Sequence, residues 1–317
     1  MIAASPFDQY LDHIVAGGDL EASVVEALAS SPDILPAGML ADALKRRLHG
    51  SRVTYLRVAV CAFDRSFADA VPPAAGEVRI SGAPDTLDIA LSAIGSARAV
   101  AGSRALTGFS WTDVERFASA AKERSVVVLT RLRDAGLEGL AVVALDTVGE
   151  PAAAVEAMAK AGFERVRLHL SKPHAGSPAA FWLAIGALQQ RIPIIESINP
   201  LPLSLSAFKP TTGYEDVKAV AIARLAAPQV PHIQVDWLRY GPKLAQVALT
   251  FGADDVDGVS ASDDAPEGRR RAPLEEIRRN VEAAGFEPVE RGGRGVHTHT
   301  AARPEGGQSN TAGQGGA

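Results

Sequence analysis

The chain has 317 residues, of which 47% are hydrophobic and 22% charged, and its formal net charge is −5. This composition is ordinary for a globular protein and excludes a global basic field that would attract nucleic acid or anionic lipid. No apolar run approaches the roughly 20 residues that span a bilayer, and residues 1–8 lack a signal-peptide pattern. The single cysteine, Cys61, excludes an internal disulfide and a multi-cysteine metal site. We therefore expect a cytoplasmic α/β protein without a bound metal, a nucleic-acid partner or membrane insertion.

Residues 1–50 form the first unit, a helical extension. Residues 20–30 and 36–48 carry apolar side chains at three- and four-residue spacing, separated by breaks at Gly17, Gly18 and Pro32.

From residue 51 to 262, short apolar runs alternate with helical patterns of 10 to 15 residues, which predicts βαβ units and a parallel sheet. No strand opens into GxGxxG or GxxxxGK, so a closed or partly open (β/α) barrel is favoured over a nucleotide-binding doubly wound sheet. Residues 125–129 have the composition of a strand, but residues 126–135 also keep an apolar helical stripe. The predicted strands are 77–81, 140–145, 165–170, 192–198 and 233–237, and the predicted helices are 86–97, 151–161, 178–190, 214–226 and 242–251.

The C-terminal part divides into two further units. Residues 263–291 comprise a charged linker (263–271) and a helix (273–284) with Gly285 as its cap, and this unit is expected to cover one side of the barrel. Residues 292–317 are rich in Gly, Ser, Thr and Gln and poor in large apolar residues, which predicts a disordered tail.

Several segments carry a family resemblance. Gly-Tyr-Glu-Asp-Val-Lys (213–218), Gly-Pro-Lys-Leu-Ala-Gln (241–246) and Phe-Gly-Ala-Asp-Asp (251–255) resemble the C-terminal half of aminofutalosine synthase and dehypoxanthine futalosine cyclase. These are radical-SAM enzymes of menaquinone biosynthesis by the futalosine pathway, and deazaflavin-cofactor synthases share a looser version. Arg-Asp-Ala-Gly-Leu (133–137) resembles the family's KEAGL turn and favours a helix over 126–135. Cys-Ala-Phe-Asp-Arg (61–65) resembles the CAFYR that closes the family's cluster motif.

The resemblance implies a radical-SAM-type (β/α) TIM-like partial barrel with an N-terminal helical extension and a C-terminal helical cap. It also implies a [4Fe–4S] cluster held by CxxxCxxC and S-adenosylmethionine bound to it, and soft thiolates are the ligands that such clusters require. Counting back from Cys61, the other two cluster positions are Val58 and Thr54, and neither side chain is a thiolate. We therefore predict no cofactor for this chain.

Other residues are weaker candidates for a site. His174 follows a predicted strand, at the end of a barrel that faces the active site, and is the candidate catalytic residue. Lys243 and Gln246 lie one helical turn apart and either contact substrate or cover the helix surface. Asp254, Asp255 and Asp257 form a carboxylate cluster that is interpreted as a solvated cap and turn, with hard-cation binding as the alternative. The pair His297 and His299 is assigned to chance, and Cys61 to packing.

Three functions remain open. The first is a cluster-free binding or partner subunit, with a cluster-bearing radical-SAM relative or a second copy as its partner. The second is an enzyme with non-radical chemistry on a nucleoside-like or aromatic-acid-like ligand in the barrel mouth. The third, conventional aminofutalosine synthase activity, requires a cluster on one cysteine. Whether the protein is an enzyme is left open, but radical chemistry is predicted to be absent.

Overall fold

One long strand, β1 (Arg52–Ala62), closes a ring of strands because it pairs in parallel with a neighbour on each side. Its carboxyl half pairs with β2 (Glu77–Ser81) and its amino half with β8 (Asp255–Ser260). The computed structural model describes residues 6–68, 70–172, 178–204, 211–265 and 272–294, which form an eight-stranded parallel barrel. The predicted (β/α) TIM-like fold is confirmed, and within these residues the ring is closed rather than partial.

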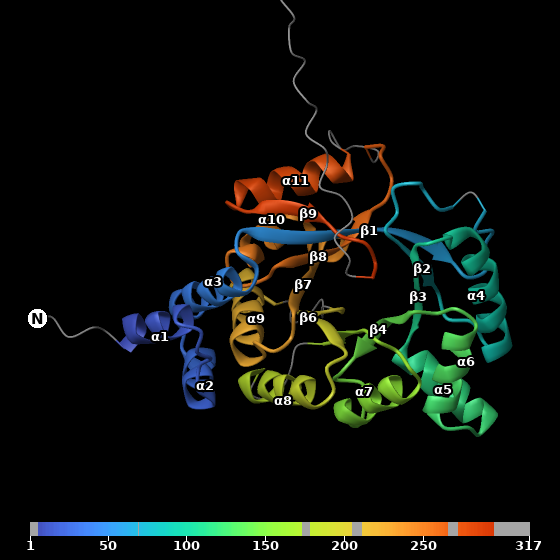
Figure 1. Cartoon of the computed structure of the whole chain (residues 1–317), viewed down its shortest axis with the longest axis horizontal. Coiled ribbons are helices and arrows are strands. Elements are labelled where there is room, and N and C mark those ends of the chain that lie inside the picture. Colours follow the sequence, from blue (N-terminus) through green and yellow to red (C-terminus); the bar gives the residue numbers. More distant parts are fainter. Residues whose placement is uncertain (1–5, 69, 173–177, 205–210, 266–271, 295–317) are drawn as a thin grey trace, which may run out of the picture.

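Helices follow the strands around the ring (Figure 1). The helices lie outside the ring of strands, and strands that are covered on their outer face are rich in apolar residues. Among the described residues no helix is long and apolar enough to cross a bilayer. The other barrel strands are β3 (Ala105–Ser110), β4 (Gly139–Ala144), β5 (Val166–Leu170), β6 (Ile195–Pro202) and β7 (His232–Asp236); the helices are α4 (Leu87–Ala101), α5 (Trp111–Ala121), α6 (Ser125–Asp134), α7 (Pro151–Lys160), α8 (Pro178–Arg191), α9 (Gly213–Ala226) and α10 (Trp237–Leu249).

Most of the predicted strands and helices are present in the structure. The segment from residue 125, whose pattern fitted both a strand and a helix, is a helix, α6, as the KEAGL-like turn favours. Strands β1, β3 and β8 and helix α5 were not among the predicted elements. The interpretation of residues 254–257 as a solvated turn is wrong, because they lead into and form a buried strand. These residues form a strand because they pair with β1 and β7, and a local sequence pattern does not show which strands will pair.

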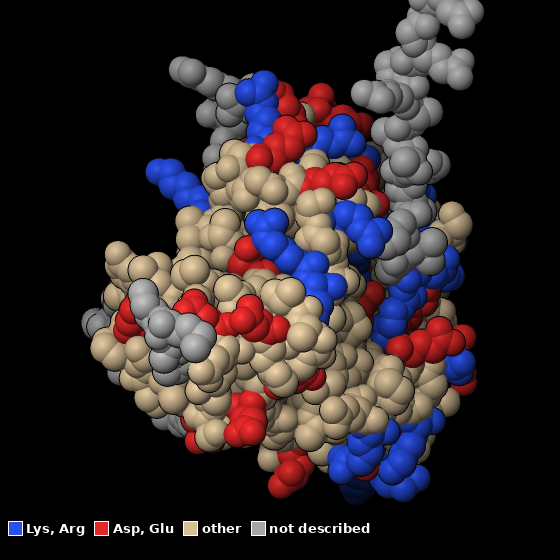
Figure 2. Space-filling view, turned by 60° about the vertical axis from the view of Figure 1, so that its left-hand side comes forward, with Lys and Arg blue, Asp and Glu red and all other residues tan. Residues whose placement is uncertain are grey.

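The helical extension consists of α1 (Pro6–Val15), α2 (Ala22–Ser30) and α3 (Leu35–His49). In Figure 1 these helices lie beside α9 and α8, and α3 packs along α9. Gly38 on α3 leaves room for Phe251, which follows α10, since a Cβ atom at this glycine would lie 2.5 Å from the Phe251 ring. On the face in Figure 2, basic and acidic side chains are mixed, and neither sign covers it.

The C-terminal unit includes the expected helix, α11 (Pro273–Ala283), and an unexpected strand, β9 (Glu287–Glu290). Strand β9 pairs in parallel with the amino half of β1, Arg52 to Tyr55. It lies on the same side of β1 as β2, which pairs with the carboxyl half. Residues 292–294 belong to the ordered barrel rather than to a disordered tail: the Gly293 N–H donates to the Gly76 carbonyl over 3.1 Å. Residues 295–317 lie outside the described residues.

Lys45 on α3 joins the extension to the C-terminal unit. Its side chain is fully buried, its ammonium donates to the Leu249 carbonyl over 2.6 Å, and it lies 3.2 Å from the centre of the Phe286 ring. Burial lowers the pKa of Lys45 to about 8, against the opposing charge of Asp42.

The lowered pKa predicts an effect of pH on stability. Between about pH 8 and 10.5 the unfolded chain holds a proton on Lys45 that the folded chain has released, so the free energy of unfolding rises with pH. In Lys45→Met this contribution is absent. Between pH 7.5 and pH 9.5, the free energy of unfolding measured in urea should rise by roughly 1–2 kcal/mol more in the wild type than in the variant. The exposed Lys160→Met is the control and should follow the wild type; parallel pH profiles for Lys45→Met and wild type would contradict the prediction.

Candidate functional site in the barrel interior

The interior of the barrel is filled by a buried ionic network. Its centre is Glu77 on β2, which is fully buried. The Glu77 carboxylate accepts hydrogen bonds from Arg79 at 2.7 Å, from Arg167 on β5 at 2.8 Å and from the Thr107 hydroxyl on β3 at 2.7 Å. Burial acts to raise the pKa of Glu77, but the guanidinium groups of Arg167 and Arg79 outweigh it and hold that pKa below its usual value.

Both arginines bind a second carboxylate. Arg79 donates to the two oxygens of Asp257 on β8 over 2.9 and 3.0 Å, and Arg167 donates to Glu196 on β6 over 2.9 Å. The network thus links β8, β2, β5 and β6 across the barrel. Such side chains remain charged inside a protein only when they are paired and hydrogen-bonded, as they are here.

A second buried pair closes the amino-terminal end of the barrel. Two nitrogens of Arg291, which follows β9, donate to the two oxygens of Asp255, each over 2.6 Å. The same carboxylate accepts from the Thr54 hydroxyl and the Gln234 amide, both at 2.6 Å. Arg291 and Asp255 are 3% and 0% exposed, so water cannot take the place of either partner in the pair.

The charged residues of this interior network were not among the predicted site residues. A signal was present, because Glu77, Arg79 and Ser81 alternate with apolar residues, and so do Arg165, Arg167 and His169. In a parallel strand that helices cover on the outside, polar residues at every second position indicate a polar barrel interior.

The carboxyl-terminal mouth of the barrel lies beyond this network. His169 on β5 is 5% exposed, and its Nδ1 has no hydrogen-bond partner among the described residues. Burial and the charges of Arg79 and Arg167 lower the pKa of His169 to about 4, despite Asp257, so the ring is neutral at pH 7. Because side chains alternate between the two faces of a strand, Val60 faces the barrel interior as Thr54 does. Val60 is 57% exposed. The barrel is therefore open to solvent at the carboxyl end of β1.

The three positions that correspond to the cluster motif lie in one continuous strand. Thr54 and Val58 face the barrel interior, whereas Cys61 faces outward, where its thiol lies 3.7 Å from the Ala70 carbonyl. Seven residues of extended strand place Thr54 and Cys61 roughly 23 Å apart. Burial raises the pKa of the Cys61 thiol. These side chains do not converge, and only one of them is a thiol, so they do not fit a [4Fe–4S] cluster.

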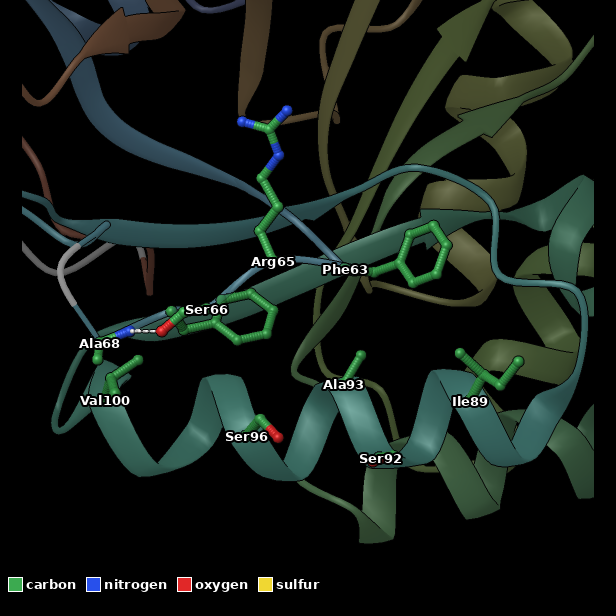
Figure 3. Close-up of a pocket in the computed structure, with 10 residues that line it drawn as sticks. Phe63, Arg65, Ser66, Ala68, Ile89, Ser92, Ala93, Ser96 and Val100 are labelled. Carbon is green, nitrogen blue, oxygen red and sulfur yellow. Dashed lines mark hydrogen bonds between the residues drawn. The ribbon is translucent and has the colours of Figure 1, made fainter.

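A groove of about 460 Å³ lies outside the barrel, between the segment that follows β1 and helix α4 (Figure 3). Phe63 and Arg65 come from the segment, whereas Ile89, Ser96 and Val100 come from α4. The Ala68 N–H donates to the Ser66 hydroxyl over 3.3 Å, which turns the segment over the helix. Small serine and alanine side chains on the helix leave the space open.

The other predicted site residues have separate outcomes. His174 lies outside the described residues. Lys243 is exposed and Gln246 is half-buried on α10, a helix that begins directly after β7 and is kinked at Gly241. Their role in binding substrate stays a prediction.

The closed parallel barrel with its surrounding helices defines a (β/α) TIM-like protein, and solved structures share this fold. Methylornithine synthase (PylB) superposes with a TM-score of 0.62 over 88% of this chain and 97% of that chain, at 13% sequence identity. The hydrogenase maturase HydG from Carboxydothermus hydrogenoformans gives 0.61 over 89% and 79%, also at 13% identity. At this identity the similarity shows the fold.

Sequence comparison identifies the relatives. Residues 204–300 match the family model described as the CofH/MqnC C-terminal region. The 5-amino-6-(D-ribitylamino)uracil–L-tyrosine 4-hydroxyphenyl transferase of Methanopyrus kandleri is 26% identical over 351 residues, which cover 90% of this chain and 95% of the relative. The Archaeoglobus fulgidus transferase is 36% identical over 122 residues, only 34% of this chain and 35% of the relative. Aminodeoxyfutalosine synthase of Thermus thermophilus is 28% identical over 220 residues (57% and 58%). The chain is thus a homologue of the CofH-type transferases and of aminodeoxyfutalosine synthase, as its motifs predicted.

The buried pair at the amino-terminal end predicts a large effect of one substitution. Arg291→Met leaves the Asp255 charge buried without its partner, which should lower the free energy of unfolding by about 3–5 kcal/mol. Arg294→Met is the matched control, because Arg294 forms an exposed pair with Glu138 and its loss should cost less than about 1 kcal/mol. Urea unfolding measures both. Equal losses in the two variants would show that the buried pair does not stabilise the barrel.

Proposed function

We propose that this chain is a cluster-free homologue of the aminofutalosine synthase family, a cytoplasmic binding or partner subunit that does not perform radical chemistry. One observation carries the proposal: β1 runs without interruption through the positions of Thr54, Val58 and Cys61. A [4Fe–4S] cluster needs three thiolates that converge on one side, with one iron left for S-adenosylmethionine. Here the chain offers a single thiol, which faces away from the barrel interior.

The comparison with Methanopyrus kandleri supports the proposal. Its matched region extends over 351 residues, more than the 317 residues of this chain. The relative therefore contains residues without a counterpart here, consistent with the loss of a cluster segment from this chain.

The rim of the barrel mouth supports a role in binding. Tyr214, at the start of α9, and Leu238, directly after β7, are 73% and 77% exposed. Both lie in the part of the chain that matches the family model, at the carboxyl-terminal end of the barrel. Large apolar side chains that are exposed at an opening favour contact with a partner or a ligand. We propose a cluster-bearing relative as that partner.

Cluster assembly is the first test. After anaerobic reconstitution with iron and sulfide, the protein should retain less than about one iron per chain and release no 5′-deoxyadenosine from S-adenosylmethionine. Cys61→Ala should behave like the wild type, and a family member with CxxxCxxC serves as the positive control. About four irons per chain together with 5′-deoxyadenosine would contradict the proposal and restore the synthase function.

Partner binding is the second test. Mass photometry of this protein with a cluster-bearing relative from the same organism should show a complex, and Leu238→Arg should weaken it by tenfold or more, roughly 1.4 kcal/mol. Val247→Arg is the matched control, since Val247 is 46% exposed further along α10, away from the mouth, and this variant should bind normally. Monomers under every condition, or equal losses in both variants, would count against a partner at the mouth.

One observation favours a second function, non-radical chemistry on a nucleoside-like or aromatic-acid-like ligand. His169 is buried near the mouth, neutral at pH 7, and has an Nδ1 without a partner among the described residues, so it is available to a bound ligand. Calorimetry with adenosine and 4-hydroxybenzoate, on wild type and His169→Phe, separates this function from the first: binding that the variant loses would support it.

A further inference from the structure

Three potential metal ligands meet where the helical extension joins the barrel. His49 is the last residue of α3, His232 the first of β7, and Asp254 immediately precedes β8. Their ligand atoms all lie within 4.8 Å of one another, and the two imidazole rings are stacked with centroids 5.3 Å apart. The cluster is at the amino-terminal end of the barrel, opposite to the mouth.

The carboxylate of Asp254 is held in a fixed orientation. Its Oδ1 accepts from the Arg224 guanidinium and, over 2.8 Å, from the Ile233 N–H. Its Oδ2 is therefore turned toward the histidines, at 3.3 Å from His49 Nε2 and 2.6 Å from His232 Nδ1. A metal ligand oriented by a second group in this way is typical of protein metal sites.

The spacing suits a tetrahedral ion. Zinc binds nitrogen and carboxylate oxygen at about 2.0–2.2 Å, which places two tetrahedral ligands about 3.3 Å apart. The distance between His49 and Asp254 already has this value. To bind the ion, His232 Nδ1 would exchange its hydrogen bond to Asp254 for a metal bond, and His49 Nε2 would exchange its 2.9 Å hydrogen bond to the Pro231 carbonyl. The two histidine side chains are 21% and 24% exposed, so solvent reaches the cluster and can supply the fourth ligand.

We propose that His49, His232 and Asp254 bind a divalent transition-metal ion of the zinc type. Two imidazoles and one carboxylate match the preferences of Zn²⁺ and Co²⁺ rather than those of Mg²⁺ or Ca²⁺. Because His49 belongs to the extension and the other two ligands to the barrel, the ion fastens α3 to the barrel. The site is independent of the proposed function at the mouth.

The test is calorimetry with Zn²⁺, and visible absorbance with Co²⁺, on the untagged full chain after treatment with a chelator. We expect one equivalent bound, and an affinity lowered about 100-fold or more in His232→Ala. His297 and His299 are the competing ligands in this chain, so the double variant His297→Ala, His299→Ala is the matched control and should bind like the wild type. Binding that the double variant loses and His232→Ala keeps would overturn the proposal, as would no binding at all.

A second readout guards against a variant that fails to fold. In His49→Gln the amide can keep the hydrogen bond that His49 Nε2 makes to the Pro231 carbonyl but provides no imidazole, and circular dichroism checks its fold. Zn²⁺ at about 100 times its dissociation constant should raise the melting temperature of the wild type by about 4 °C and leave that of His49→Gln unchanged. Equal shifts in both would assign the metal to another place, and no shift in either would leave a hydrogen-bonded cluster without a metal function.

Discussion

The buried carboxylate of Asp255 constrains the amino-terminal end of the barrel, because it needs a positively charged partner, and Arg291, near the end of the described residues, supplies it. An unpaired charge in this position would be costly, since the residue has no access to water. The last strand, β9, carries Arg291 to the amino-terminal end of the barrel by pairing with β1. Through Arg291, the C-terminal unit therefore neutralises a charge that is buried in the barrel.

Under the proposed function, the position of the charged residues explains how the fold persists without a cluster segment. Glu77, Arg79, Arg167 and Asp257 satisfy one another inside the barrel, so the interior does not need an added group to neutralise them. The family's cluster segment, by contrast, would lie at the carboxyl end of β1, where Val60 is exposed. Arg79 of this network is in register with Val60, so the paired charges fill the interior up to the level of the mouth.

Buried ion pairs also bear on the similarity of residues 204–300 to the family model. Part of that similarity has a structural reason, because Arg224 and Asp254 bind each other and Asp255 belongs to the pair that closes the barrel. Tyr214 and Leu238, which are exposed, belong to neither pair, and under the proposed function they contact the partner.

The sequence by itself determined the class of fold, the relatives and most helices, since alternating apolar patterns, Gly and Pro punctuation and short motifs are local properties of the chain. It also established that one thiol is present. Only the tertiary structure decided that Asp254, Asp255 and Asp257 are buried partners of arginines, that Thr54 and Cys61 face opposite sides of one strand, and that His49 and His232 meet. The physical reason is that burial and ion pairing depend on which strands and helices become neighbours. Residues 49, 232 and 254, or 255 and 291, are brought together by barrel closure, and no local pattern encodes that contact.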